Sequence, residues 1–206
     1  MAKVKQINVN DIVTETALCK LFDQYASNVL HDYTQDMERK KRERYKVKVT
    51  KELPTQEEYQ SLKQKHYTTT VETLISDAFS EIESLRDEMQ ERYDNMPENL
   101  QGGDIGTRCE EAASTLDNCQ QPDYPSSLGT IECVFLPSLK EVSRADRCSE
   151  AQSMLETAKD ELQSVLDSEE KENGETQKHN AIETLMDELD EAIQTLSDVE
   201  FPGMYG

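Results

Sequence analysis

The chain has 206 residues, a formal net charge of −21 and 35% hydrophobic residues, a low share for a globular domain. No apolar run approaches the roughly 20 residues that cross a bilayer, and the N-terminus lacks the apolar core of a signal peptide. We therefore expect a cytoplasmic protein without membrane association, and the lack of Trp together with few Gly and Pro residues favours long helices over a β-sandwich.

The charge is unevenly distributed. Residues 1–66 contain 13 basic and 10 acidic side chains, whereas the remaining residues contain 9 basic and 33 acidic ones. The negative electrostatic field of residues 67–206 repels nucleic acid and anionic membranes and attracts basic surfaces. The expected partner is a protein with a basic surface, and direct binding of nucleic acid is not expected.

Residues 1–53 are predicted to form an N-terminal domain around one long helix. Asn10 is a candidate N-cap, and the helix is expected to continue to about residue 44. Its apolar stripe comprises Leu18, Leu21, Phe22, Tyr25, Val29, Tyr33 and Met37. The alternating segment YKVKVTK predicts a short strand near 45–50.

The one basic cluster of the chain overlaps the end of this domain. It comprises Arg39, Lys40, Lys41, Arg42, Arg44, Lys46 and Lys48. Nucleic-acid contact would require interleaved aromatic side chains, and only Tyr45 supplies one. Pairing with an acidic helix of the same chain is the favoured interpretation, and ligand binding is the alternative.

Residues 54–206 are predicted to form an acidic helical bundle. Thr55 and Glu58 form a capping-box pattern that opens a helix over 54–95. Its apolar positions have heptad spacing, namely Val71, Ile75, Ala78, Ile82, Leu85 and Met89. This pattern requires a second helix alongside, from the same chain or from another copy.

Three further helices are expected over 104–119, 138–166 and 180–198, with a minor β element near 130–136. The second of these helices could begin at Ser138 or at Ser143. The last two helices carry apolar seams and are joined by a polar loop, which predicts an antiparallel hairpin. The predicted fold class is mostly α, as an elongated bundle or helical hairpins with coiled-coil-like seams that could also support a homo-oligomer.

The C-terminal tail, 199–206, departs from this pattern. Pro202 and Gly203 end the helix, and the tail contains the apolar residues Phe201, Met204 and Tyr205. It either caps the end of the bundle or serves as an exposed docking peptide.

Motifs for catalysis, metal binding or cofactor binding are not found. The five cysteines form no CxxC pair and are expected to be reduced thiols, and the three histidines fit no metal-binding spacing. Neither a nucleophile elbow nor a phosphate-binding glycine loop is present. We expect no enzyme activity and no cofactor.

Rows of carboxylates on the predicted helices are the candidate interaction surface. They comprise Glu81, Asp87, Glu88, Glu91 and Asp94, then Glu156, Asp160, Glu161 and Asp167, then Glu183, Asp187, Asp190, Glu191 and Asp198. Such rows could meet a basic protein surface or imitate the phosphates of DNA.

Two segments, ERYDNMPENLQGGDIGTRCEEAASTLDNC and DVEFPGMYG, resemble segments of acidic helical proteins of tailed bacteriophages and prophages. The resemblance implies a helix that ends in a Tyr-Asp-Asn-x-Pro-Glu turn before a Glu- and Ala-rich helix, and it implies no catalytic residues. It suggests a phage accessory protein in the host cytoplasm that binds and inhibits or redirects a host or anti-phage defence protein. A DNA mimic and a scaffolding component of phage assembly are the alternatives.

Overall fold

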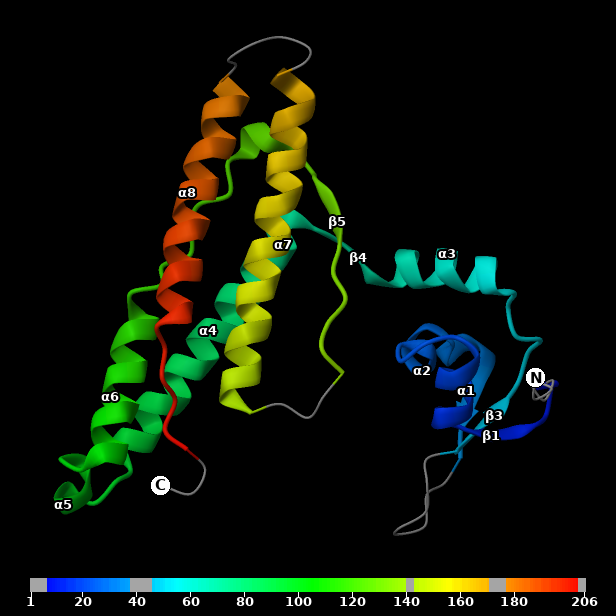
Figure 1. The fold of residues 1–206 in the computed structure, drawn as a ribbon, viewed down its shortest axis with the longest axis horizontal. Coiled ribbons are helices and arrows are strands. Elements are labelled where there is room, and N and C mark those ends of the chain that lie inside the picture. Colours follow the sequence, from blue (N-terminus) through cyan, green and yellow to red (C-terminus); the bar gives the residue numbers. More distant parts are fainter. Residues whose placement is uncertain (1–6, 38–45, 140–142, 171–176, 204–206) are drawn as a thin grey trace. The chain divides into compact units, whose positions relative to one another are not determined.

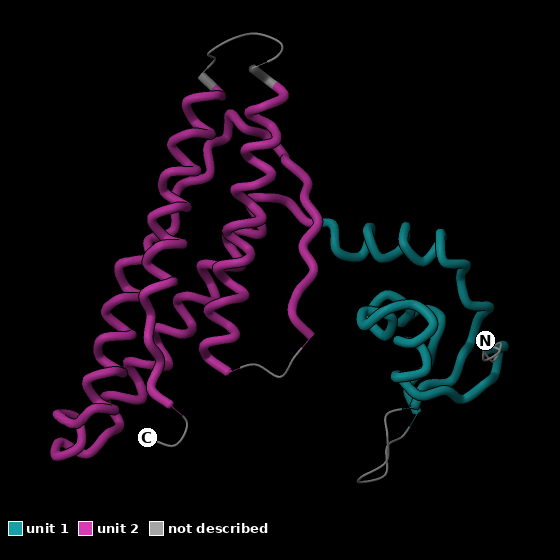
Figure 2. Tube along the Cα trace, in the orientation of Figure 1, with its two compact units in different colours: residues 1–68 teal, residues 69–206 magenta. Residues whose placement is uncertain are grey.

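A computed structural model describes residues 7–37, 46–139, 143–170 and 177–203 of the chain, which is mostly helical as predicted. The chain forms two compact units, Met1–Thr68 and Thr69–Gly206 (Figure 2). The boundary lies after the position predicted at 53/54, because helix α3 (Gln56–Tyr67) packs against helix α2 (Ala26–Val29) of the first unit.

The predicted long helix over 10–44 is wrong. The first unit instead contains the elements β1 (Ile12–Thr14), α1 (Glu15–Leu21), α2, η1 (His31–Tyr33) and β2 (Thr34–Asp36) (Figure 1). The β-branched run Ile12-Val13-Thr14 favours a strand. Asn10 has a positive φ of 71°, which is not an N-cap conformation. After α1, the Asp23 carboxylate accepts a hydrogen bond from the backbone N–H of Tyr25 at 2.9 Å and stabilises a turn.

The predicted strand near 45–50 is confirmed as β3 (Lys46–Val49). It is the central strand of a three-stranded sheet with the order β1-β3-β2, antiparallel to both neighbours. Val47 and Val49 are buried, whereas Lys46 is exposed and Lys48 half-buried, as alternation along a strand requires. Most of the predicted apolar stripe serves this core, since Leu18 and Val29 are buried in it, but Met37 is exposed.

The predicted continuous helix over 54–95 is interrupted in its middle. Strand β4 (Thr68–Thr70) separates α3 from α4 (Val71–Asp94). Three successive β-branched Thr residues favour the extended conformation, and the Thr70 hydroxyl then accepts the backbone N–H of Thr73 at 3.1 Å to begin α4. The capping box at the start of α3 is confirmed by the hydrogen bonds between Thr55 and Glu58.

The remaining elements of the second unit follow the predicted order. They are α5 (Glu98–Gln101), α6 (Asp104–Asp117), η2 (Ser126–Leu128), β5 (Glu132–Val134), α7 (Arg144–Glu170) and α8 (Gln177–Ser197). Of the two starts predicted for the helix that reaches 166, Ser143 is confirmed, because α7 begins directly after it. Ser143 and Asp146 explain this start, because the Ser143 Oγ accepts the Asp146 N–H at 3.2 Å while the Asp146 carboxylate accepts the Ser143 N–H at 3.0 Å.

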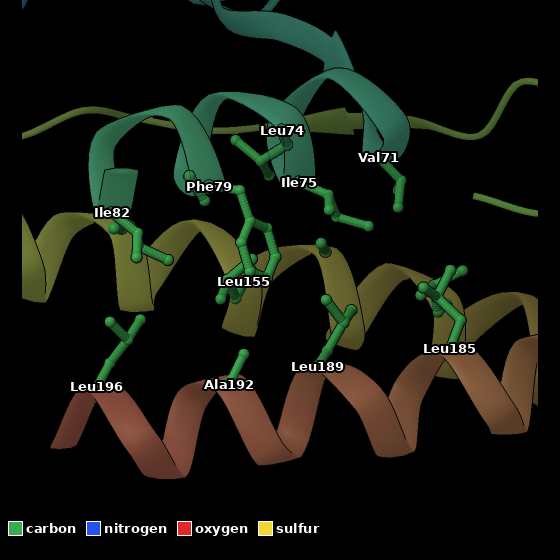
Figure 3. Close-up of a cluster of buried hydrophobic side chains, with 14 of the residues drawn as sticks. Val71, Leu74, Ile75, Phe79, Ile82, Leu155, Leu185, Leu189, Ala192 and Leu196 are labelled. Carbon is green, nitrogen blue, oxygen red and sulfur yellow. The ribbon is translucent and has the colours of Figure 1, made fainter. Parts of the chain in front are cut away.

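The core of the second unit lies between its four long helices. Helix α4 packs against α6 and α7, and α8 packs against α7 and α6 (Figure 1). All six heptad positions predicted for α4 are buried, five of them in this core and Met89 in a smaller cluster with Cys109 of α6. Figure 3 shows side chains of α4 such as Val71 and Ile82 facing Leu155 of α7 and Leu189 of α8. The apolar seams therefore meet one another within the chain.

The described part of the C-terminal tail packs on this bundle. Val199 and Phe201 contact the cluster that contains Met89 and Cys109, and Pro202 is buried. Of the proposed docking residues, Phe201 is therefore a bundle cap, whereas Met204 and Tyr205 lie outside the described residues.

Candidate interaction surface

Two of the candidate carboxylates, Glu81 and Glu88 on α4, are only partly exposed and are bound by arginine side chains of α7. Arg147 of α7 forms ion pairs with both Glu81 and Glu88 of α4, and its Nη2 donates to the Ser84 hydroxyl at 3.1 Å. Arg144 Nε adds a hydrogen bond to Glu88 at 2.9 Å. The hydrogen bonds from Arg147 outweigh burial and hold the pKa of Glu88 below its usual range. These two carboxylates join α4 to α7, and their charge is already compensated by arginine side chains of the same chain.

Several other candidate carboxylates have local partners on the surface. Lys159 of α7 bonds both oxygens of Asp190 on α8, at 2.5 and 2.7 Å. Asp87 accepts from its neighbour Arg86 at 2.8 Å, and His179 lies 3.4 Å from Glu183. Asp94, Glu156 and Asp167 each accept a side-chain hydrogen bond from the Gln four residues earlier. Exposed pairs of this kind are worth at most about 1 kcal/mol, so a partner can replace them.

The remaining exposed candidates form no ion pair with any of the described residues. They are Glu91 on α4, Asp160 on α7 and Asp187 and Glu191 on α8, with Asp198 directly after α8. Glu161 is half-buried, near Cys133. The uncompensated negative charge therefore gathers on the outward faces of the bundle, and most densely on α8.

A polar hollow adjoins this part of α8. It has a volume of about 440 Å³ and lies between α8 and residues 118–123, which follow α6. The carboxylates of Asp123, Glu188 and Glu191 line it, with Thr195 and Cys119, and no basic side chain does. This arrangement can receive a cationic side chain of a partner. Asp123 and Glu188 are not among the residues predicted from the sequence. The spacing of Glu188 from Glu191 on one helix could have indicated Glu188, whereas the position of Asp123 depends on the fold.

The cysteines show no sign of activation. Cys109, Cys133 and Cys148 are buried, and all five cysteines are free thiols. Burial raises the pKa of Cys148 to about 11, and it also raises the pKa of Cys119 beside the hollow. Both thiols are therefore protonated and weakly nucleophilic at neutral pH. In the part of the chain that the structure describes, no group of three or more metal-ligating side chains is arranged to hold an ion.

The predicted basic cluster falls mainly outside the described residues. Only Lys46 and Lys48 on β3 are described, and neither has an ion-pair partner within the described ranges. Arg39, Lys40, Lys41, Arg42 and Arg44 all lie in the undescribed segment 38–45.

No protein-family model, curated protein or solved structure matches the chain. Among the helices that the structure describes, none combines the length and the apolar character needed to span a membrane.

Proposed function

We propose that this is a non-enzymatic accessory protein that binds a basic surface of another protein through the outer faces of α4, α7 and α8, and inhibits or redirects that partner. The observation that carries the proposal is the sorting of the carboxylates. Those between helices, such as Glu81 and Glu88, have Arg partners, whereas the outward ones, such as Asp187 and Glu191, have none among the described residues.

The charge balance supports this reading. Residues 67–206 contain only 9 basic side chains against 33 acidic ones. Arg86, Arg144, Arg147 and Lys159 are already engaged in ion pairs within the second unit. The negative electrostatic field of the carboxylates that remain accelerates association with a positively charged partner and disfavours binding of negatively charged proteins.

The biological setting is part of the proposal and rests on the resemblance of two segments to phage proteins. In that setting the protein acts in the host cytoplasm, and its partner is a host protein or an anti-phage defence protein. Self-assembly through the heptad seams is less well supported, because those side chains, for example Ile75 and Leu85, are buried in the chain's own core.

Mimicry of DNA is a second candidate, favoured by the row on α8. The carboxylates of Glu183, Asp187 and Asp190 recur every three or four residues, or about 4.5–6 Å along the helix axis. A protein that normally neutralises phosphates could bind such a row, and its affinity would fall steeply with salt.

Affinity capture from an extract of the encoding organism or its host, at low and high salt, tests the proposal. The wild-type protein, used as bait, is compared with an α8 variant that carries the three substitutions Asp187→Asn, Glu188→Gln and Glu191→Gln. A matched control, Asp36→Asn, Glu52→Gln, Glu57→Gln, changes the net charge equally on exposed residues of the first unit. We expect a protein that the wild type and the control retain and the α8 variant loses.

The outcomes separate the candidates. A captured nucleic-acid-binding protein that is released by salt and by competing DNA would assign mimicry. Equal capture by all three baits would count against the α8 face. Failure to retain any specific protein at either salt concentration would count against partner binding itself.

A further inference from the structure

We propose that residues 132–136, strand β5 and its continuation, form a docking edge that accepts an extended segment with alternating basic and apolar side chains from a partner protein. The segment would add to β5 as a new strand. The basic character of the segment rests on the proposed function above, whereas the docking edge itself rests on the following observations.

The side chains of this segment alternate between the core and solvent. Cys133 is buried and Phe135 packs against the main core of the second unit. Glu132, Val134 and Leu136 point outward, and Val134 and Leu136 are 39% and 41% exposed. Two neighbouring branched apolar side chains on the open face of a strand are the kind of surface that cross-strand contacts cover.

The backbone of this segment has an open edge. The Val71 N–H donates to the Ile131 C=O at 2.9 Å, so the peptide groups of Ile131 face β4. Because these groups alternate along a strand, those of Glu132 and Val134 face the opposite edge. Apart from the β4–β5 ladder, the described residues provide no hydrogen-bond partner for the backbone of 132–137. An edge of this kind is a template for strand addition.

Charge selects the occupant. The second unit is strongly acidic, and Glu132 lies on the same exposed face as Val134 and Leu136. The same edge of a second copy, in its own acidic second unit, would bring negative charge to β5, whereas Lys or Arg side chains would be attracted to it. Apolar side chains at alternate positions would lie beside Val134 and Leu136. The occupant is therefore an extended basic and apolar segment of another protein.

A synthetic peptide, (Lys-Val)4, is the probe. We take the peptide to run antiparallel to β5, where the peptide groups of a hydrogen-bonded cross-strand pair face each other and both side chains lie on one face of the sheet. Valines that pack on Val134 and Leu136 must therefore turn their own N–H groups toward β5. N-methylation of the valine amides is expected to weaken binding at least about tenfold, whereas N-methylation of the lysine amides should leave it nearly unchanged.

Protein variants provide the second comparison. Val134→Lys and Leu136→Lys should each weaken binding of (Lys-Val)4, measured by fluorescence anisotropy with the full-length protein. Leu100→Lys is the matched control, because Leu100 is also exposed, at 54%, and the charge change is identical. Thermal unfolding of each variant establishes that the fold is retained, and hydrogen exchange should show protection of the Val134 amide when the peptide binds.

Three results would overturn the docking edge. The first is equal binding of the two N-methylated peptides, and the second is equal weakening by Leu100→Lys and Val134→Lys. Both would indicate general attraction to the acidic surface, which leaves the proposed function standing. The third is a dimer of the free protein that Val134→Lys dissociates, because this would assign the edge to a second copy. Loss of capture by the α8 variant tests the proposed function separately.

Discussion

Asp23 is the polar centre of the first unit. The hydroxyl of the fully buried Tyr59 donates to its Oδ1 at 2.5 Å, and Lys63 Nζ lies 2.9 Å from its Oδ2. Lys63 also lies over the Tyr25 ring, 4.5 Å from its centroid. Burial raises the pKa of Asp23, but the hydrogen bonds from Tyr59, Lys63 and the Tyr25 N–H together lower it by more. The pKa of Asp23 is therefore below its usual range. This cluster fastens α3 to the turn after α1.

Replacing Tyr59 with Phe removes one donor and keeps the buried ring. We expect Tyr59→Phe to lower the free energy of unfolding of the first unit by about 1–3 kcal/mol at pH 7, measured by urea denaturation. Because the pKa of Asp23 is lower in the folded than in the unfolded protein, Asp23 contributes stability at pH values above its unfolded-state pKa of about 4. This contribution is lost as the pH falls through the folded-state pKa. The variant should therefore lose less stability than the wild type between pH 5 and 3.

Tyr67→Phe is the control for this prediction. The Tyr67 hydroxyl accepts a hydrogen bond from Asn28 at 3.2 Å on the surface, so its loss should cost less than about 0.5 kcal/mol. If both Phe variants had the same stability and the same pH profile, Asp23 would not be the fastening point.

Single residues were predictable from the sequence only where their partners are local. The capping box of Thr55 and Glu58 spans three residues, and the sequence pattern alone identified it. Asp23 and Tyr59 are 36 residues apart, and Arg147 is 59 residues from Glu88. No spacing rule connects such pairs, because the fold alone brings them together.

At the scale of elements, the approach of α6 to the end of α5 depends on one glycine. Gly106 is buried, and a Cβ atom there would lie 2.0 Å from the backbone oxygen of Gln101. Since the obstruction is backbone, it cannot move aside as a side chain could. We expect Gly106→Ala to lower the free energy of unfolding of the second unit by about 1–3 kcal/mol, measured by thermal and urea unfolding.

Gly102 offers a matched control in the same turn. Its φ of −80° suits any residue, and a Cβ there would meet nothing within 4 Å. Gly102→Ala should therefore be neutral or slightly stabilising, by less than about 1 kcal/mol. Equal destabilisation by both alanines would show that α5 and α6 do not approach as closely as described.

The contact of α4 with α7 provides a third prediction. Arg147→Met leaves Glu81 and Glu88 facing α7 without their shared cation, and we expect a loss of about 1–2 kcal/mol at pH 7. The lowered pKa of Glu88 contributes stability that is present above the unfolded value of about 4.3 and is lost as the pH falls through the lower folded value, so wild type and variant should converge over that pH range.

Lys159→Met is the control, since Lys159 joins α7 to α8 through the more exposed Asp190. It should change stability by less than about 0.5 kcal/mol. A loss equal to that of Arg147→Met would mean that bridging two carboxylates confers no advantage over one surface pair.

Helical periodicity predicted the helices of the second unit well, but it failed at three short strands, 12–14, 34–36 and 68–70, each of which pairs with a strand from elsewhere in the chain. The strands at 12–14 and 68–70 are runs of β-branched residues. Most of the residues predicted to form an apolar stripe over 18–37 do share one core, as Leu18 and Val29 show. They are brought together by several short elements that turn back on each other, not by one straight helix. Strand pairing at a distance overrode a local pattern that also fits a helix.

At the scale of the whole molecule, the sequence predicted the acidity but not its sorting. Glu81 and Glu91 look alike in a helical row, yet the first faces Arg147 and the second faces solvent. Which side of α4 meets α7 follows from packing of the apolar seams. The hollow lined by Asp123 and Glu188 likewise depends on where residues 118–123 cross α8.

Uncompensated surface charge has a consequence for the stability of the whole second unit. The helices hold exposed carboxylates such as Asp187, Glu188 and Glu191 within one or two turns of each other, and like charges repel. At 0.1 M salt the Debye length is about 10 Å, so added salt screens this repulsion. We expect the melting temperature of the second unit to rise by several degrees between 0.02 and 0.5 M NaCl, which corresponds to about 1–2 kcal/mol.

The variant Asp187→Asn, Glu188→Gln, Glu191→Gln identifies the source of this salt effect. It removes three repelling charges that have no ion-pair partner among the described residues, so it should melt higher than the wild type at 0.02 M NaCl and respond less to added salt. Glu81→Gln with Glu88→Gln should instead melt lower at every salt concentration, because it removes the partners of Arg147. A wild-type melting temperature that falls with salt would mean that attractive ion pairs outweigh repulsion, and the outward carboxylates would then lack the excess field from which partner binding is inferred.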